Sequence, residues 1–240
     1  MSSETLQVGK HHIVVMRSAR RRTLSLEIAQ GHALLRVPQH LPLRVCKDFI
    51  SSKLAWLNRH AAKLAAPPSN ITFSDGLRIN TLGQSATLVH QKTRQGPASR
   101  DDNLIKVPLA RCQSPEKAAF RKLVTLFKSE LARYISTVCQ EKAVAMGVST
   151  AELRIRDYRR RWGSCDQQGN LSFNWRLIFA PRPVIDYVVI HELAHRIEFN
   201  HSARFWAVVE EFCPQSEDAK RWLRDHGSSV YRYQAESSER

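Results

Sequence analysis

The sequence predicts an α+β protein in which strands and helices are segregated along the chain. Over the first 112 residues, short apolar runs rich in β-branched residues are separated by turn signals, with one helical pattern among them. From residue 113 onward, patterns of helical spacing dominate. Segregated elements favour α+β over a doubly wound parallel sheet. We therefore predict a β-rich N-terminal region with one helix over residues 1–112 and a second domain over residues 113–240.

The N-terminal region begins with three short apolar runs, which predict an antiparallel meander over residues 11–37: HHIVVMR, TLSLEIA and HALLRVP. Helical spacing follows from Leu43 to Ala65, and Pro67-Pro68 ends it. Two further segments, GLRINTLGQSATLVH and NLIKVPL, predict three more short strands. No internal repeat is visible in the sequence.

The second domain begins with a long helical pattern over residues 115–146, which Gly147 ends. ELRIRDY and NLSFNWRL then predict two strands on either side of a turn, RRRWGSCDQQG. Proline residues at 181 and 183 open a helix that extends to about Glu198. Two shorter helices are predicted over residues 202–211 and up to Trp222.

The charge balance is strongly basic. The chain has 37 Lys and Arg residues against 22 Asp and Glu, a formal net charge of +15, and arginine predominates. Guanidinium groups bind phosphate and carboxylate better than ammonium groups do. The balance suits nucleic acid, nucleotides or acidic polypeptides as partners, and a solvated surface explains it equally well.

The five cysteines are scattered and never spaced as CxxC, which favours a reducing compartment over a disulfide framework. No apolar run approaches the roughly 18 residues that a membrane helix needs. The first twenty residues lack the apolar core of a secretory signal. We therefore expect a cytoplasmic protein without membrane contact.

The most informative segment is the HExxH sequence at His191–His195. Two histidines at i and i+4 lie about 40° apart around a helix, so both imidazoles reach one point on the same face. Glu192 is close enough to contact a metal-bound water without being a ligand. Apolar neighbours surround the segment, and bare imidazoles there would be costly without a partner. The pattern predicts a zinc site with a general base.

A catalytic zinc ion needs a third protein ligand and an open position for water. His201 follows His195 by six residues, and Ser202 is suited to cap the next helix, so the chain can turn back toward the first two imidazoles. Glu198 is the nearest competitor, because it lies three residues after His195. The remaining alternatives are Glu210 and Glu211.

Four segments carry a resemblance to a known family: RWGSC, NWRLIFAP, DYVVIHELAH and NHSARFW. Together with the earlier SARRRTLSLEI, they resemble the YgjP-like metallopeptidase family, which is grouped with the SprT-like and WLM zinc proteases. The resemblance covers nearly the whole chain. It implies a zincin-like catalytic domain with a small sheet beside the HExxH helix, with His191, His195 and His201 as zinc ligands and Glu192 as the catalytic acid/base.

Substrate contacts are expected from the basic turn and the strand after it. Arg161 is a candidate to pair with a substrate carboxylate or phosphate, and Asn174 to hydrogen-bond the substrate or a group behind it. Trp162, Gly163 and Cys165 are better explained by packing and backbone requirements.

The leading functional prediction is a zinc-dependent metallopeptidase in which Glu192 activates a zinc-bound water. The alternative is a nucleoside-triphosphate (UTP-type) pyrophosphatase that uses the same zinc site, because arginine suits triphosphates, although no phosphate-binding glycine loop is present. A third hypothesis is a DNA-associated protease or a nucleic-acid-binding protein that uses the basic surface.

Overall fold

The computed structural model describes residues 3–9, 11–29, 32–59 and 70–233. The chain divides into two compact units, Met1–Ser69 and Asn70–Arg240. The sequence-based boundary between residues 112 and 113 differs from this division. It followed the change from strands to helices, but the strands before that change pack on the helix after it and share its core.

The first unit contains a four-stranded sheet in the order β1-β2-β4-β3. Its strands and helices are β1 Ser3–Val8, β2 His11–Ser18, β3 Ser25–Ala29, β4 His32–Pro38, α1 Leu43–Ser52 and α2 Leu54–Arg59. The predicted antiparallel meander is wrong, because β4 lies between β2 and β3 and runs parallel to β2. The predicted single helix is divided at Lys53, and its last residues fall outside the described ranges.

The core of the first unit lies between one face of this sheet and the two helices. Alternate residues of β2 and β4 are fully buried there, as the period of two requires. The helices contribute Cys46, Ile50 and Leu57 to the same cluster. His11 is also buried, and its Nε2 lies 2.8 Å from Asn58 Oδ1.

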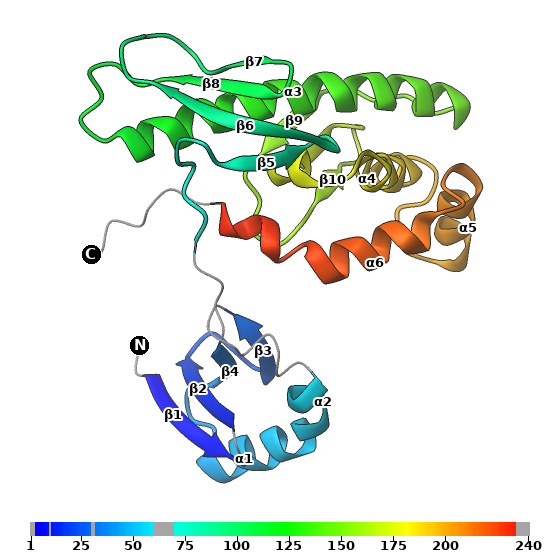
Figure 1. The fold of residues 1–240 in the computed structure, drawn as a ribbon. Helices are drawn as coiled ribbons and strands as arrows, with labels where there is room; N and C mark the ends of the chain where they lie inside the picture. The colour runs from blue at the N-terminus through cyan, green and yellow to red at the C-terminus, as the bar shows by residue number, and fades with distance from the viewer. Residues whose placement is uncertain (1–2, 10, 30–31, 60–69, 234–240) are drawn as a thin grey trace. The chain divides into compact units, whose positions relative to one another are not determined.

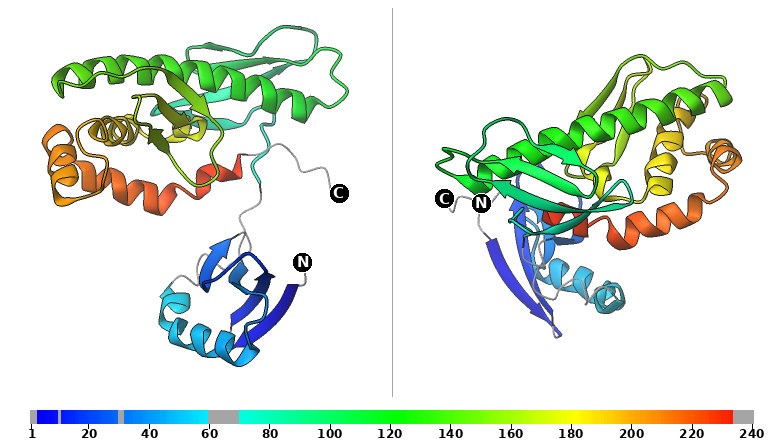
Figure 2. Two further views of the ribbon diagram at one scale, coloured as in Figure 1. Left: turned by 180° about the vertical axis from the view of Figure 1, so that it is seen from behind. Right: turned by 45° about the horizontal axis from the view of Figure 1, so that its top comes forward.

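The second unit begins with another four-stranded sheet, in the order β5-β6-β8-β7. Its strands are β5 Arg78–Thr81, β6 Gln84–Gln91, β7 Ser99–Asp101 and β8 Leu104–Pro108. The 31-residue helix α3, Pro115–Ala145, runs alongside this sheet (Figures 1 and 2) and confirms the long helix predicted from residue 115. It ends before Gly147, whose positive φ of 65° suits glycine.

The two sheets share one topology, although the sequence shows no repeat. In each, two antiparallel hairpins lie side by side with their inner strands parallel, and a helix follows. Strands β2 and β6 both have eight residues, and the inner strands β4 and β8 both end in Val-Pro. The registers coincide as well, because Ser18 pairs with Pro38 where Gln91 pairs with Pro108. The second unit therefore contains a structural repeat of the first.

The rest of the second unit carries a three-stranded sheet and a group of helices. These elements are β9 Leu153–Arg156, β10 Gly163–Cys165, β11 Leu171–Asn174, η2 Trp175–Phe179, α4 Arg182–Ala194, α5 Ala203–Phe212, α6 Ser216–His226 and η3 Ser229–Arg232. Strand β10 was not predicted: it lies within the segment taken as a turn. The helix through Glu198 was predicted too long, because α4 ends at Ala194.

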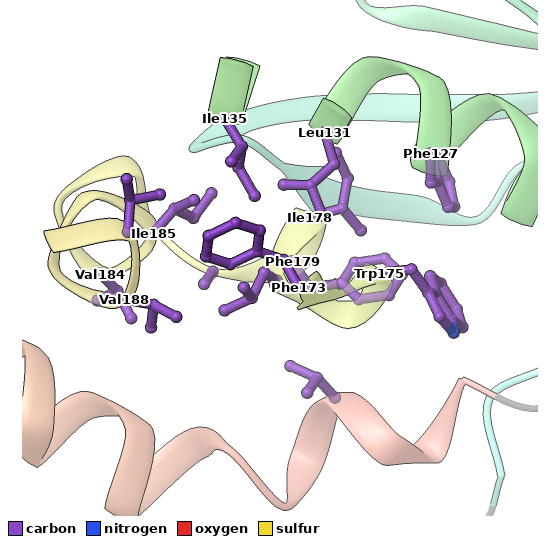
Figure 3. Packing of buried hydrophobic residues seen from close by; sticks show 14 of the residues in the cluster. Phe127, Leu131, Ile135, Phe173, Trp175, Ile178, Phe179, Val184, Ile185 and Val188 are labelled. Carbon is purple, nitrogen blue, oxygen red and sulfur yellow. The ribbon is translucent and has the colours of Figure 1, made fainter. Parts of the chain in front are cut away.

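A single core joins these elements to α3. Figure 3 shows aromatic and aliphatic side chains of β11 and η2 filling the space between α3 and α4. The side chains that pack there are Phe127, Leu131, Ile135, Phe173, Trp175, Ile178, Phe179, Val184, Ile185 and Val188. Strands and helices are segregated as predicted, so the α+β class is confirmed. No helix of the described residues has the length and apolar character needed to span a bilayer.

Candidate metal centre

Helix α4 carries the first part of the site. Pro183 stands in its first turn, where a missing amide hydrogen costs nothing, and most of the helix is buried against α3, α5 and α6. His191 and His195 lie one turn apart near its C-terminal end, and His195 is the C-cap residue. Their ring centroids are 5.1 Å apart, so the i, i+4 spacing places both imidazoles on one side of the helix, as predicted.

A turn after α4 brings in His201. Ser202 begins α5, and its side-chain oxygen accepts a hydrogen bond from the Phe205 amide at 3.3 Å, which is the predicted cap. The His201 ring lies 5.1 Å from His191 and 4.9 Å from His195, centroid to centroid. One nitrogen from each of these three rings falls within 4.8 Å of the other two.

This donor set fits a zinc ion. The Nε2 atoms of His191 and His201 are 3.2 Å apart. Two nitrogens that bind one tetrahedral zinc at about 2.0–2.1 Å are separated by about 3.3–3.4 Å. Neutral imidazoles are preferred zinc ligands, and three of them leave a coordination position open. The residues therefore match a catalytic rather than a closed structural site.

Protonation of two of these histidines is disfavoured. Burial, together with the neighbouring rings of His195 and His201, lowers the pKa of His191 to about 4. Burial also lowers the pKa of His195. The Nδ1 atom of His195 lies 3.3 Å from the carbonyl oxygen of Glu198, which can only accept, so that nitrogen carries the hydrogen and Nε2 is free to bind a metal.

Two aromatic side chains of α5, Phe205 and Trp206, pack against the three imidazoles. The Phe205 ring is fully buried and lies 4.9, 4.6 and 4.7 Å from the rings of His191, His195 and His201. Trp206 stacks on His201 at 5.7 Å, and Lys220 Nζ lies 3.9 Å from the centre of the Trp206 ring. These two aromatic side chains of α5 therefore pack directly against the histidine rings.

Glu192 follows His191 in α4, and its side chain lies against Gly163 of strand β10. Its side chain is buried, and desolvation raises its pKa to about 8, an effect that the Arg161 guanidinium partly offsets. A bound dication would lower this value again. The surroundings therefore increase the proton affinity of the Glu192 carboxylate, which suits a general base.

Gly163 provides the space that Glu192 occupies. A Cβ atom at this position would lie 2.7 Å from Cγ and 2.8 Å from Cδ of Glu192, well inside van der Waals contact. The sequence indicated a backbone requirement here, and the structure identifies it as the close approach of β10 to the glutamate. Only glycine lets the strand lie this near.

Asn174 is not placed to touch a substrate. Its side chain is completely buried, and its amide nitrogen lies within 3.0 Å of the carbonyl oxygens of Tyr158 and Arg161 and 2.8 Å from the Tyr231 hydroxyl. Its Oδ1 accepts from the Arg176 amide and caps η2. Of the two roles expected for Asn174, the structure shows the bond to protein groups: they use the amide, which anchors the 158–161 segment.

Arg161 itself is exposed, at the end of that anchored segment. Its guanidinium lies 5.3 Å from the centre of the Tyr158 ring and close enough to Glu192 to lower the pKa of that carboxyl. A contact of Arg161 with substrate stays a prediction. The contribution of Tyr231 to this arrangement was missed, because a tyrosine in a polar C-terminal segment gives no sequence signal for it.

The competing metal ligands lie outside the cluster. Among the described residues, only the three histidines form a group with metal-binding spacing. Glu198 is held by its own turn, where its Oε1 lies 3.4 Å from the Asn200 amide. Glu210 and Glu211 are exposed on α5, and the Cys165 thiol faces the carbonyl of Asp166.

An α+β unit that presents three converging imidazoles beside a buried glutamate belongs to the class of metal-dependent hydrolases by its chemistry. The family model described as YgjP-like, metallopeptidase domain, matches residues 22–226. The match covers most of the chain and both units, so the protein belongs to the YgjP-like metallopeptidase family.

Two solved structures are similar to part of the chain. The metallopeptidase zymogen of Pyrococcus abyssi abylysin is 21% identical, with a TM-score of 0.36, and the match covers 41% of this chain and 97% of that one. The metallopeptidase zymogen of Methanocaldococcus jannaschii jannalysin is 15% identical, with a TM-score of 0.35, and the match covers 38% and 94% respectively. A comparison with curated proteins gives no match.

Proposed function

We propose that this protein is a zinc-dependent metallopeptidase in which His191, His195 and His201 hold the metal and Glu192 is the catalytic acid/base. The observation that carries the proposal is the convergence of three imidazole nitrogens within 4.8 Å of one another beside a buried carboxylate. Membership of the YgjP-like metallopeptidase family supports the same reaction class.

Zinc, when bound, polarises a substrate carbonyl and makes a nearby water more acidic. Glu192 accepts the proton of the attacking water at a carboxylate oxygen and delivers it to the leaving nitrogen. Burial favours the first transfer, because a carboxylate in a desolvated position has an increased proton affinity. Phe205 holds the three imidazoles in place through direct ring contacts.

The edge of the small sheet supports a polypeptide substrate. Strand β10 is the outer strand of the order β10-β11-β9, so one side of its backbone has no strand partner within that sheet. Its first residue, Gly163, lies directly against Glu192. An extended peptide that adds to this edge as a further strand would place a backbone carbonyl next to the glutamate. We assign Arg161 to the substrate at the same end, through a carboxylate or a developing oxyanion.

The experiment is mass spectrometry of a mixed pool of nucleoside triphosphates and an unfolded polypeptide, incubated with the zinc-loaded protein and with Glu192→Gln. New peptides that appear only with the wild-type protein would establish the peptidase. Conversion of a triphosphate to its monophosphate, again only with the wild-type protein and without new peptides, would replace the peptidase with a pyrophosphatase that uses the same site.

A further inference from the structure

A basic hollow lies on the first unit, in a part of the chain that contributes nothing to the metal centre. Its volume is about 300 Å³. The residues that line it come from β2, the turn after β2, and β4: Met16, Arg17, Ser18, Arg20, Arg21 and Arg36. Four guanidinium groups thus surround a space large enough for a small anion.

Hydrogen bonds fix two of these arginines without using all of their donors. Arg21 donates from Nε to the carbonyl of Thr23 at 3.1 Å and from one terminal nitrogen to the Ser25 hydroxyl at 2.6 Å. Arg17 donates to the carbonyl oxygens of Gln39 and Leu41. Each guanidinium has five N–H donors in a planar fork, so both groups are oriented with donors to spare.

The charges around the hollow do not cancel. Glu27 accepts from Arg36 at 2.6 Å, and Glu4 lies 3.8 Å from Arg17. Among the described residues, no carboxylate lies within ion-pair distance of Arg20 or Arg21, and two positive charges are left over. A phosphodiester linkage carries one charge and two free oxygens, as a carboxylate does, but successive linkages of a nucleic-acid strand follow one another at about 3.4 Å of helix axis per charge. The two unpaired cations therefore match consecutive phosphates of one strand.

The second sheet shows which of these arginines the architecture requires. At the position that matches Arg17, strand β6 has His90, whereas Arg36 is matched by another cation, Lys106, which forms the equivalent ion pair. The two sheets keep the same topology and the same pairing, so Arg17 is not a requirement of the architecture. A cation that the fold does not require is available to a ligand.

We propose that this hollow binds a phosphate group, with the phosphodiester chain of a nucleic acid as its source. Bidentate guanidinium contacts hold the phosphate oxygens, and the Ser18 hydroxyl is available as a further donor. The first unit as a whole favours such a partner, because residues 1–69 contain 11 Lys and Arg and 3 Asp and Glu by count from the sequence, a net charge of +8. The proposal does not depend on the metal centre.

The test is fluorescence anisotropy of a labelled single-stranded oligonucleotide with the full-length protein, repeated with inorganic phosphate and with polyglutamate as competitors. The variants are Arg20→Gln with Arg21→Gln, Arg20→Gln alone, and Arg22→Gln. Arg22 is exposed in the same turn but does not line the hollow, so its variant is matched in charge. Arg20→Gln alone keeps the hydrogen bonds of Arg21, and thermal unfolding of every variant checks the fold.

We expect the double variant to bind about tenfold more weakly, Arg20→Gln to show part of this loss, and Arg22→Gln to stay within about twofold of the wild-type protein. Calorimetry follows the binding of inorganic phosphate by itself; if the hollow variants lose phosphate binding and keep oligonucleotide binding, the nucleic-acid source is overturned in favour of a small phosphate compound. Equal losses in Arg22→Gln, or no loss in either hollow variant, would overturn the proposal. Competition by polyglutamate as effective as that of the oligonucleotide would also overturn it, in favour of an acidic polypeptide.

Discussion

The two four-stranded sheets have the same topology, but they differ in the helices and functional residues around them. In the first unit, two short helices cover the sheet, and the turn between its hairpins is rich in arginine. In the second unit, the 31-residue helix α3 covers the sheet and extends beyond it to pack on η2 and α4. The metal centre is built on these later elements. The sheet is thus a scaffold in both units, and the residues added around it determine the chemistry.

The largest effect should come from the metal centre itself. We expect His195→Ala to lose both zinc and peptide cleavage, because two imidazoles remain. Glu192→Gln should keep its zinc and lose about 10²–10⁴-fold in turnover, because it cannot accept the proton. Metal analysis and cleavage rates on the same samples check this, and a Gln variant with near-normal turnover would remove Glu192 from the mechanism.

Gly163→Ala should have the next largest effect. The added methyl group has no room beside Glu192, so either the carboxylate or strand β10 must move. A displacement of about 1 Å costs about a hundredfold in turnover, and zinc content should be unchanged. Ser164→Ala is the control, since it removes only the hydrogen-bonding contact with the Tyr158 hydroxyl at 3.2 Å. Equal rates for the two variants would mean that the close approach is unimportant.

A matched pair of core truncations tests whether the two sheets contribute independently to stability and zinc binding. Leu35 and Ile105 are both fully buried and occupy the same place in the repeated pairing, opposite Val15 and Leu88. Replacement of either by Ala should cost about 2–5 kcal/mol of stability in its own unit. Only Ile105→Ala should weaken zinc binding, and zinc should raise the unfolding temperature of the second unit alone. Calorimetry with and without zinc measures both, and an effect of Leu35→Ala on zinc affinity would break the separation.

The smallest effects concern a cross-strand ion pair that occurs in both sheets, Arg36–Glu27 and Lys106–Asp101. Glu27→Gln should cost at most about 1 kcal/mol, because the pair is partly exposed. The Lys106 ammonium donates to Asp101 and lowers the pKa of that carboxyl. The Lys106–Asp101 contribution is therefore present at neutral pH and lost as the pH falls through the lowered pKa. A carboxyl titration by NMR should find this pKa below 3.8 and show it rising in Lys106→Met; an unchanged pKa would contradict the ion pair.

Local sequence rules indicated the three histidines of the site, but they did not predict the strand and the buried amide around them. The i, i+4 spacing of His191 and His195 and the cap at Ser202 favoured His201 over the glutamate alternatives, and the three rings do converge. Strand β10 was missed because it is only three residues long, begins with glycine and follows a run of arginines. The two roles expected for Asn174 could not be separated from the sequence, because burial decides whether an amide binds the protein or a ligand, and burial is a property of the whole fold.

The topology of the sheets was also beyond local reasoning. Six of the eight strands in these two sheets were predicted, and the outer strands β1 and β7 were missed. Strands that are consecutive in sequence are usually neighbours, but here each second hairpin turns back so that the inner strands are parallel. The repeat was not visible because few residues are shared between the two sheets. The unit boundary was placed late because the change in composition near residue 113 marks the start of α3, which packs on the strands before it.

X-ray absorption at the zinc edge tests the three-histidine centre most directly. For the zinc-loaded wild-type protein we predict a first shell of light atoms with the multiple-scattering signature of three imidazoles, and for His201→Ala one imidazole fewer. A sulfur ligand in the wild-type spectrum, or an unchanged imidazole count in His201→Ala, would contradict the assignment of His191, His195 and His201 as the metal ligands.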